Sequence, residues 1–329
     1  MDSELIQLVQ GIEPIDQQQQ EQYFQKLYAR YGNTEPAILM GAAKLLSLSK
    51  EEVLQPLKKA ILIFAADHAV DGLENKTHGK WSRNMAEEIA KGKSAINSAA
   101  HRIGAGVLLL EMGMEQPIVE YTGVQDLQVM RGSHFWEYRE AMSSQEMMDA
   151  LYSGIQLAFA LYQEGYHAIG LGNLGERAMI TALVLTTAYC KSRFRQHDFS
   201  KQGAQVTSLL QHLEEKNISI SDPLLTLQKV GAPDIAAMIG VILGAAYNRM
   251  CVTFDNAVTG AAVLMAQCIC SACKEYLFTV VQYDEPIHQM QMNVLGYSPF
   301  LKTDFYDGMG MGSVLGLSVL DAAQKLVLT

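Results

Sequence analysis

The sequence predicts an α/β protein in which a parallel sheet is covered by helices on both faces. From residue 56 onward, short apolar runs alternate with longer segments of helical pattern. Such alternation implies right-handed crossovers between parallel strands. The 329 residues are 49% hydrophobic and 18% charged. That composition supports a large packed core and excludes a disordered or collagenous chain.

The first predicted element is a helix over residues 16–32, ahead of the alternating part of the chain. Large residues recur in it at spacings of three and four, which gives one apolar stripe. The stripe consists of Tyr23, Phe24, Leu27, Tyr28 and Tyr31. It fits two interpretations: packing on the helix's own domain, or contact with another subunit.

Continuous apolar runs predict five short buried strands. They cover residues 61–66, 107–110, 167–171, 250–254 and 276–281. The predicted helices between and after them cover residues 177–190, 234–249, 260–274 and 312–328. Residues 193–229 are polar, and we expect a surface excursion, without a separate domain, in which Asp222 and Pro223 start a helix.

Polar residues follow several of the predicted strands. They are Asp67, His68, Asn173, Asp255 and Asp284. In open parallel sheets, ligands bind outside the carboxyl ends of the strands. We therefore expect these side chains to share one pocket.

A glycine-rich loop lies between the predicted strand at 167–171 and the helix that follows it. Gly170, Gly172 and Gly175 have the spacing of a dinucleotide-binding loop. The loop lies mid-chain, however, and no acidic residue stands about 20 positions later, as a dinucleotide site requires. A loop that holds a phosphate is the favoured interpretation, and we expect no cofactor.

Charge and hydropathy exclude some partners. The chain has 25 Lys and Arg against 35 Asp and Glu, a net charge of −10, which argues against general nucleic-acid binding. The longest wholly apolar stretch, residues 235–246, is shorter than the roughly 18 residues of a membrane span. Residues 1–10 carry acidic residues and no basic run, so we expect no signal peptide.

Five cysteines in so long a chain form no disulfide framework, so the expected location is a reducing cytoplasm. Cys268, Cys270 and Cys273 are close in sequence, but no second ligand pair accompanies them. We therefore expect buried thiols and no metal.

Five segments, in order, resemble motifs of one family. Residues 64–70 (FAADHAV) are similar to its FAADHGV, and residues 93–97 (KSAIN) to its GAAIN. Residues 234–246 (DIAAMIGVILGAA) closely resemble EIAAMAGAILGAA. Residues 284–288 (DEPIH) and 308–312 (GMGMG) resemble AEPGH and GEGTG. The family is nicotinate-nucleotide:dimethylbenzimidazole phosphoribosyltransferase, and the resemblance runs from about residue 62 to the C-terminus.

The resemblance implies a Rossmann-like domain over residues 40–286, and a small helical domain from residues 1–39 with 287–329. It also implies a dimer and a reaction that moves the phosphoribosyl group of nicotinate mononucleotide to an aromatic acceptor, with inversion at C1′. The substrate-binding positions that we expect are Asp67, His68, Asn173, Gly175, Asp255, Tyr283, Gly308 and Gly310. The protein's main task in this reaction is to position the acceptor and remove its proton.

Several positions depart from the family pattern. The glutamate of GEGTG, which is the family's catalytic base, is Met309 here, and a thioether is a poor proton acceptor. The family loop GEMGIGNTT, which holds the phosphoribosyl part, falls on residues 170–178. Its glutamate becomes Leu171, its second glycine becomes Asn173, and its NTT becomes Glu176-Arg177-Ala178.

Two further departures concern the acceptor and the AEPGH motif. The acceptor-contacting stretch PQEV falls near residues 78–81, with one residue deleted. A serine expected before AEPGH falls on Tyr283. We therefore expect the base-less subunit of a heteromeric enzyme, partnered by a homologue that carries the intact glutamate. A two-chain variant of the family uses phenol or p-cresol as the acceptor.

Two alternatives remain open. One is an autonomous homodimer with a relocated base, for which Asp304 and Asp307 are the nearest carboxylates. The other is a protein that binds a nucleotide or an aromatic base without turnover. An adjacent gene for a homologue with an intact GEGTG would favour the heteromer.

Overall fold

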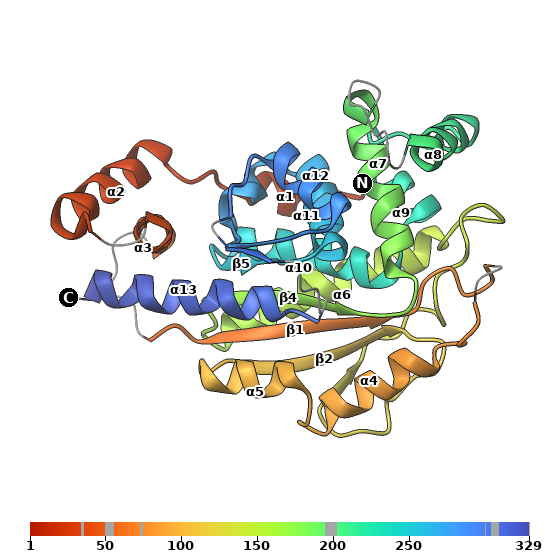
Figure 1. Cartoon of the computed structure of the whole chain (residues 1–329), viewed down its shortest axis with the longest axis horizontal. Coiled ribbons are helices and arrows are strands. Elements are labelled where there is room, and N and C mark those ends of the chain that lie inside the picture. Colours follow the sequence, from red (N-terminus) through yellow and green to blue (C-terminus); the bar gives the residue numbers. More distant parts are fainter. Residues whose placement is uncertain are drawn as a thin grey trace.

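The protein is described by a computed structural model that covers residues 1–33, 36–49, 56–72, 75–194, 203–299, 301–303 and 309–328. Its centre is a parallel sheet with the strand order β3-β2-β1-β4-β5-β6 (Figure 1). The strands are β1 (Lys59–Ala66), β2 (Gly106–Gly113), β3 (Val124–Asp126), β4 (Ala168–Leu174), β5 (Cys251–Thr253) and β6 (Leu277–Phe278). The predicted parallel α/β architecture is confirmed.

The two central strands, β1 and β4, are buried along their whole length. Strands covered on both faces read as continuous apolar runs, which is why these two were visible in the sequence. The order of the strands reverses between β1 and β4, because the chain builds β2 and β3 on one side and β5 and β6 on the other. Ligands in such sheets bind at the carboxyl ends beside this switch point.

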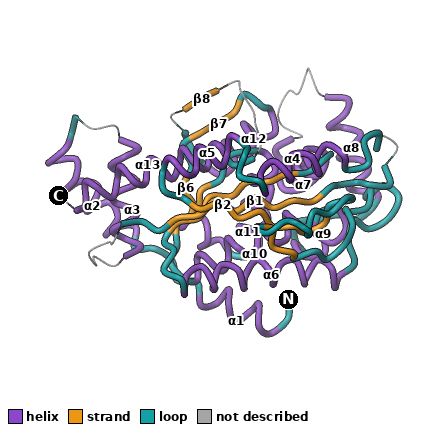
Figure 2. The backbone as a smooth tube through the Cα atoms, turned by 90° about the horizontal axis from the view of Figure 1, so that it is seen from below, coloured by secondary structure: helices purple, strands orange, loops and turns teal. Residues whose placement is uncertain are grey.

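Helices cover both faces of the sheet (Figure 2). One side carries α1 (Ser3–Gly11), α6 (Ser144–Gln163) and α10 (Pro233–Tyr247). The other carries α4 (Lys80–Ala90), α5 (Ala95–Arg102) and α13 (Met311–Leu328). Helices α6 and α10 approach so closely that a Cβ atom on Gly240 of α10 would lie 2.0 Å from the Leu151 carbonyl oxygen of α6. The small residues of the α10 motif thus serve packing.

The remaining helices are α2 (Gln17–Tyr31), α3 (Pro36–Ser49), α7 (Ala178–Phe194), α8 (Gly203–Glu215), α9 (Pro223–Val230), α11 (Ala257–Ile269) and α12 (Pro286–Leu295). Asp222 caps α9 and Pro223 is its first residue, as predicted. Among the described residues, no helix is both long and apolar enough to cross a membrane.

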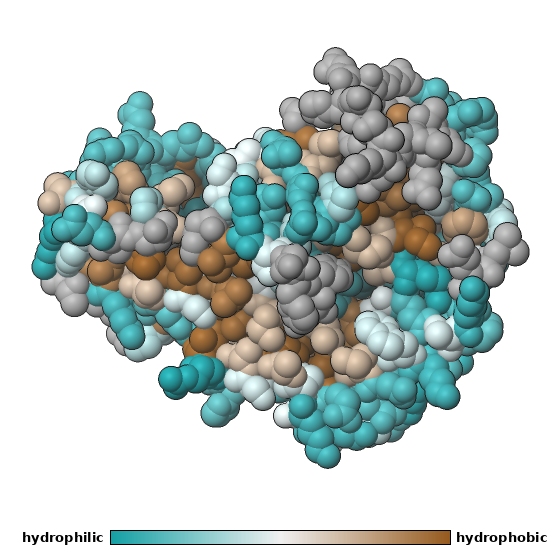
Figure 3. Space-filling view, in the orientation of Figure 1, coloured by the Kyte–Doolittle hydropathy of each residue, from teal (hydrophilic) through white to brown (hydrophobic). Residues whose placement is uncertain are grey.

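Helices α2 and α3 lie with the C-terminal part of α13 at one end of the molecule (Figure 1). A Cβ atom on Gly41 of α3 would lie 3.3 Å from Ala323 of α13. The division at residues 40 and 287 stays a prediction, and α3 spans residue 40. Hydrophobic surface gathers over α13 and the sheet beside it (Figure 3), where Leu315 is exposed. In the α2 stripe, Tyr23 and Leu27 are buried within the chain, whereas Tyr28 is half exposed.

Two predicted elements are wrong in extent. The strand expected at residues 276–281 is divided: β6 ends at Phe278, and β7 (Val281–Tyr283) pairs with β8 (Leu301–Thr303) in a second sheet. The chain turns between them, where the Thr279 hydroxyl donates to the Phe254 carbonyl oxygen. The helix expected at 260–274 ends at Ile269, because Cys270 is extended and a 3-10 turn over Ser271–Tyr276 follows.

Candidate functional site

Two groups of residues lie at the carboxyl edge of the sheet. The Asp67 cluster comprises Asp67, His68, Glu115, Glu176 and Arg177, from the loops after β1, β2 and β4. The Gly310 cluster comprises Asn173, Asp255, Tyr283, Met309 and Gly310, from β4, the loop after β5, β7 and the segment before α13.

Asp67 is fully buried and accepts three hydrogen bonds from the protein. Its Oδ1 accepts from the Ser82 hydroxyl at 2.6 Å and from the Glu176 amide at 3.0 Å. Its Oδ2 accepts from the Glu115 amide at 2.8 Å. One carboxylate therefore joins three loops and α4, and a substrate that bonded to it would compete with these donors.

His68 is also fully buried, and it faces the helices that cover the sheet. Its Nδ1 lies 2.8 Å from the Thr181 hydroxyl of α7, and its Nε2 lies 3.2 Å from the Asp234 carboxylate of α10. The side chain joins the end of β1 to two helices. The closely matching segment that begins at Asp234 thus contributes a polar anchor as well as apolar packing.

Glu176 and Arg177 form an ion pair at 2.9 Å in the loop after β4. The Glu176 carboxylate also accepts from the Trp81 amide at 3.0 Å and from the Thr77 hydroxyl. Burial acts to raise the pKa of Glu176, but these hydrogen bonds and the Arg177 charge outweigh it, so the pKa lies below its usual value. Glu176 is therefore an anion at neutral pH.

In the Gly310 cluster, two backbone segments pack directly on each other. Gly310 has φ +97°, which favours glycine. A Cβ atom on Gly172 would lie 2.7 Å from the Met309 carbonyl oxygen. The Gly312 amide, at the start of α13, donates to Asp255 Oδ2 at 3.0 Å. The glycine-rich segment before α13 is thus pressed onto β4 and fixed to the end of β5.

Asn173 and Tyr283 complete the Gly310 cluster. Asn173 accepts from the Asn256 side-chain amide at 2.8 Å. The Tyr283 side chain is 4% exposed, and its hydroxyl would lie 3.1 Å from a Cβ atom on Gly312. The Tyr283 ring also packs against buried His288, with ring centroids 5.9 Å apart. Burial lowers the pKa of His288 to about 4, so the imidazole is neutral at pH 7.

The structure places most of the predicted residues at one edge of the sheet and separates them into two clusters. Asp67 and His68 lie in the first cluster, and Asn173, Asp255, Tyr283 and Gly310 in the second. Gly175 lies between them, so close to β1 that a Cβ atom would be 1.6 Å from the Ala66 carbonyl oxygen. Gly308, Asp304 and Asp307 lie outside the described residues. The substrate roles of all these positions stay predictions.

Asp284 does not join either cluster. It is exposed at the end of β7 and accepts from the Gln289 side chain at 2.6 Å. It was expected with the others because residues 276–281 were predicted as one strand of the main sheet. The division of that strand moves Asp284 to the second sheet.

Sequence reasoning missed Glu111, a fully buried carboxylate on β2. Its Oε1 accepts from the Met114 amide at 2.6 Å, and its Oε2 has no hydrogen-bond partner among the residues that the structure describes. Burial raises the pKa of Glu111 to about 7. The available signal was one charged residue inside the apolar run of β2.

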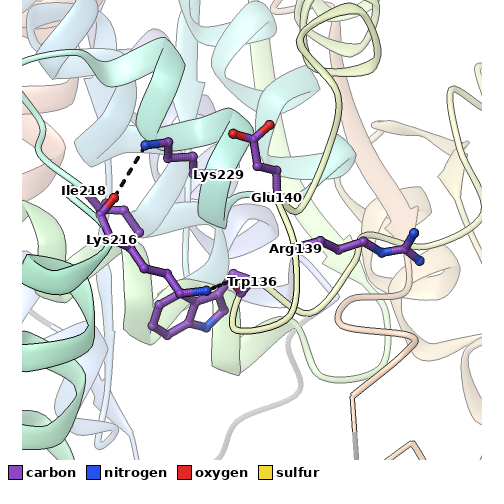
Figure 4. Close-up of a pocket in the computed structure, with 6 residues that line it drawn as sticks. All are labelled: Trp136, Arg139, Glu140, Lys216, Ile218 and Lys229. Atoms are coloured by element: carbon purple, nitrogen blue, oxygen red, sulfur yellow. Dashed lines mark hydrogen bonds between the residues drawn. The ribbon is translucent and has the colours of Figure 1, made fainter.

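A separate cavity of about 280 Å³ has no residue of either cluster in its lining. It is lined by Trp136, Arg139, Glu140, Lys216, Ile218 and Lys229 (Figure 4). Lys216 donates to the carbonyl oxygens of Trp136 and Glu137, which fixes its ammonium group against the wall of the cavity. Within the described ranges, no group of three His, Cys, Asp or Glu residues could hold a metal ion.

Comparison with known proteins supports the resemblance. A family model described as phosphoribosyltransferase matches residues 37–328. The nicotinate-nucleotide–dimethylbenzimidazole phosphoribosyltransferase of Geobacter metallireducens is 30% identical over 281 residues, covering 82% of this chain and 79% of that protein. The protein of the same name from Dehalococcoides mccartyi strain BAV1 is 28% identical over 280 residues, with the same two coverages.

A solved structure shows the same fold. The crystal structure of nicotinate-nucleotide–dimethylbenzimidazole phosphoribosyltransferase from Thermus thermophilus superposes with a TM-score of 0.77 at 22% identity, covering 99% of this chain and 96% of that one. The parallel sheet with flanking helices is therefore shared with that protein. The chain belongs to the nicotinate-nucleotide–dimethylbenzimidazole phosphoribosyltransferase family.

Proposed function

We propose that this chain is one subunit of a heteromeric α-phosphoribosyltransferase, whose other subunit is a homologue with an intact catalytic glutamate. The enzyme transfers phosphoribosyl from nicotinate mononucleotide to an aromatic acceptor, which is phenol, p-cresol or dimethylbenzimidazole. The product is the lower-ligand nucleotide of a cobamide. Membership of the family supports the reaction class.

The observation that carries the proposal is Met309 at the position of the family's base. The backbone around it is tightly fixed, because the Met309 carbonyl oxygen packs on Gly172 and Gly312 donates to Asp255. The loop thus keeps a defined place at the edge of the sheet, but the side chain that it presents is a thioether. A thioether is at best a weak acceptor and cannot take a proton from a substrate at neutral pH.

Loss of the catalytic base has a large effect on the rate of this reaction. A phenol has a hydroxyl pKa of about 10, so it attacks C1′ efficiently only when a base takes its proton. Loss of general-base catalysis costs about 10²- to 10⁴-fold in rate. The partner's glutamate supplies the base in this proposal.

We propose that substrate contacts of this chain centre on the Gly310 cluster, with Asn173, Asp255, Tyr283 and the backbone at Gly308 and Gly310. The bonds already made by Asp67 and His68 favour a supporting role for the Asp67 cluster, because their polar atoms bond to protein donors and acceptors. Gly175 serves the same support by letting the loop after β4 approach β1.

Coexpression with a homologue that retains GEGTG tests the proposal. We expect a stable hetero-oligomer in sedimentation, and release of nicotinate by the pair when an aromatic acceptor is present. A matched pair in which the partner's motif glutamate is replaced by glutamine should assemble but not turn over. Separate homodimers, or unchanged turnover by the glutamine pair, would contradict the proposal.

The two alternatives give different results in the same experiment. An autonomous homodimer with Asp304 or Asp307 as base would release nicotinate without a partner, and would lose activity when that aspartate is replaced by asparagine. A binding protein would retain nucleotide or aromatic base but give no turnover in either form.

A further inference from the structure

The N-terminus of α4 receives its cap from a distant segment of the chain. Its N-cap residue is Gly79, which has no side chain to accept the first amides of the helix. Glu176 takes that role from the loop after β4, where it accepts from the Trp81 amide and the Thr77 hydroxyl. We call these two contacts the Glu176 bridge. A carboxylate at a helix N-terminus is favoured by both hydrogen bonding and the helix dipole.

Arg177 fixes the bridge from the other side. Its backbone has φ +65°, an uncommon conformation for a residue with a side chain. In that conformation Nη1 donates to Glu176 and to the Asn75 side chain, each at 2.9 Å, and Nε donates to the His68 carbonyl oxygen. Nε and Nη1 are therefore bonded to groups of the protein, whereas Nη2 makes no hydrogen bond within the described residues and lies 3.7 Å from the Glu115 carboxylate.

The bridge is buried and charged. The Glu176 side chain is 8% exposed and that of Arg177 is 11% exposed. Glu176 is ionised at neutral pH, for the reasons given above. A second anion placed beside the Glu176 carboxylate would be repelled by it.

We infer that Glu176 closes this chain's own pocket to nicotinate mononucleotide, by tying residues 170–178 directly to residues 77–81. The inference rests on the proposed function and on the family resemblance, which implies that the phosphoribosyl group lies against residues 170–178 and the aromatic acceptor against residues 78–81. Glu176 is then the residue that determines which subunit of the heteromer accepts the nucleotide.

Calorimetric titration of the full chain with nicotinate mononucleotide tests the inference. The test variant is Glu176→Asn with Arg177→Thr, which introduces the family's residues at both positions. We expect no saturable binding by the wild type, and affinity at least about 10-fold higher in the double variant. The matched control is Glu146→Asn, which removes a carboxylate from the capping box of α6, away from the loop. It should leave binding unchanged.

Hydrogen exchange at the Trp81 amide reports the bridge independently of any ligand. The amide should exchange faster in the double variant than in the wild type or the control, while the core strands stay protected. Equal exchange in all three proteins would show that the bridge does not form. Tight nucleotide binding by the wild type, or no gain in a folded double variant with fast Trp81 exchange, would also overturn the inference.

These outcomes are separable from the fate of the proposed function. Nucleotide binding by the wild type would overturn the inference and leave the heteromeric enzyme standing. A heteromer without turnover would overturn the proposed function, even if the double variant gained nucleotide binding as expected.

Discussion

The Asp67 and Gly310 clusters occupy the same edge of one sheet, yet they are held in different ways. The Asp67 cluster depends on charged side chains that bond to amides and hydroxyls from four segments of the chain. The Gly310 cluster depends on glycine backbone that packs on β4 and on one helix terminus fixed to Asp255. A polar residue at the end of a strand is thus not by itself a ligand site. Its existing hydrogen bonds decide whether it is available.

The largest expected effect is a loss of stability when the Asp67 cluster loses its central carboxylate. Asp67→Ala removes the acceptor of three buried donors, so it should lower the free energy of unfolding by about 3–5 kcal/mol. Urea unfolding followed by circular dichroism measures the change. Asp71→Ala is the matched control, because its side chain is 30% exposed, and it should cost about 1 kcal/mol or less. Similar losses in the two variants would show that Asp67 is not the structural centre that its contacts indicate.

The next effect is the pH dependence of stability that Glu111 causes beside the Asp67 cluster. Burial raises the pKa of Glu111 to about 7 from a usual value near 4.5. The folded state therefore binds a proton that the unfolded state releases. The stabilisation from protonated Glu111 is complete below pH 4.5 and is lost as the pH rises through 7. Between pH 4.5 and 8 the loss should reach about 3 kcal/mol.

The variant Glu111→Gln isolates this term. It keeps the side chain's shape and cannot ionise, so the free energy of unfolding should fall less between pH 5 and pH 8 than in the wild type. Urea titrations at both pH values give the comparison. The same decrease in both proteins would assign the pH dependence to other groups.

A smaller effect of opposite sign is expected beside the Gly310 cluster. Burial lowers the pKa of His288 to about 4 from 6.5, so the unfolded state binds the proton more readily. The stability from neutral His288 is present above pH 6.5 and is lost as the pH falls toward 4, with about 2 kcal/mol lost by pH 5. In His288→Gln the free energy of unfolding should depend less on pH between 7 and 5. An unchanged slope would contradict the assignment.

The sequence predicted the strands and helices whose formation depends on local pattern. Apolar runs indicated β1 and β4, and Asp222 with Pro223 indicated the start of α9. It did not predict the break between β6 and β7, because the turn at Thr279 depends on a contact with Phe254 from another strand. The helix at Lys80–Ala90 was also missed, since its N-terminal cap comes from Glu176, about a hundred residues later in the chain.

The candidate site was likewise predicted only in part. The apolar runs placed Asp67, Asn173 and Asp255 at strand ends, and the structure shows them there. Sequence could not show that Asp67 is already bonded to three donors, because those donors come from segments far apart in the chain. Glu176 was identified from the sequence only as a departure from the family's loop, and the structure adds that it caps a helix.

The most direct test of the claim that this subunit lacks its own catalytic machinery is an assay of nicotinate release. The assay contains the purified chain alone, nicotinate mononucleotide and an aromatic acceptor. We expect no release by the wild type and little by Met309→Glu, because the new base would still face the bridged loop. Met309→Glu combined with Glu176→Asn and Arg177→Thr should release more nicotinate than either part alone. Robust release by the wild type, with contamination by a partner excluded by mass spectrometry, would contradict the claim.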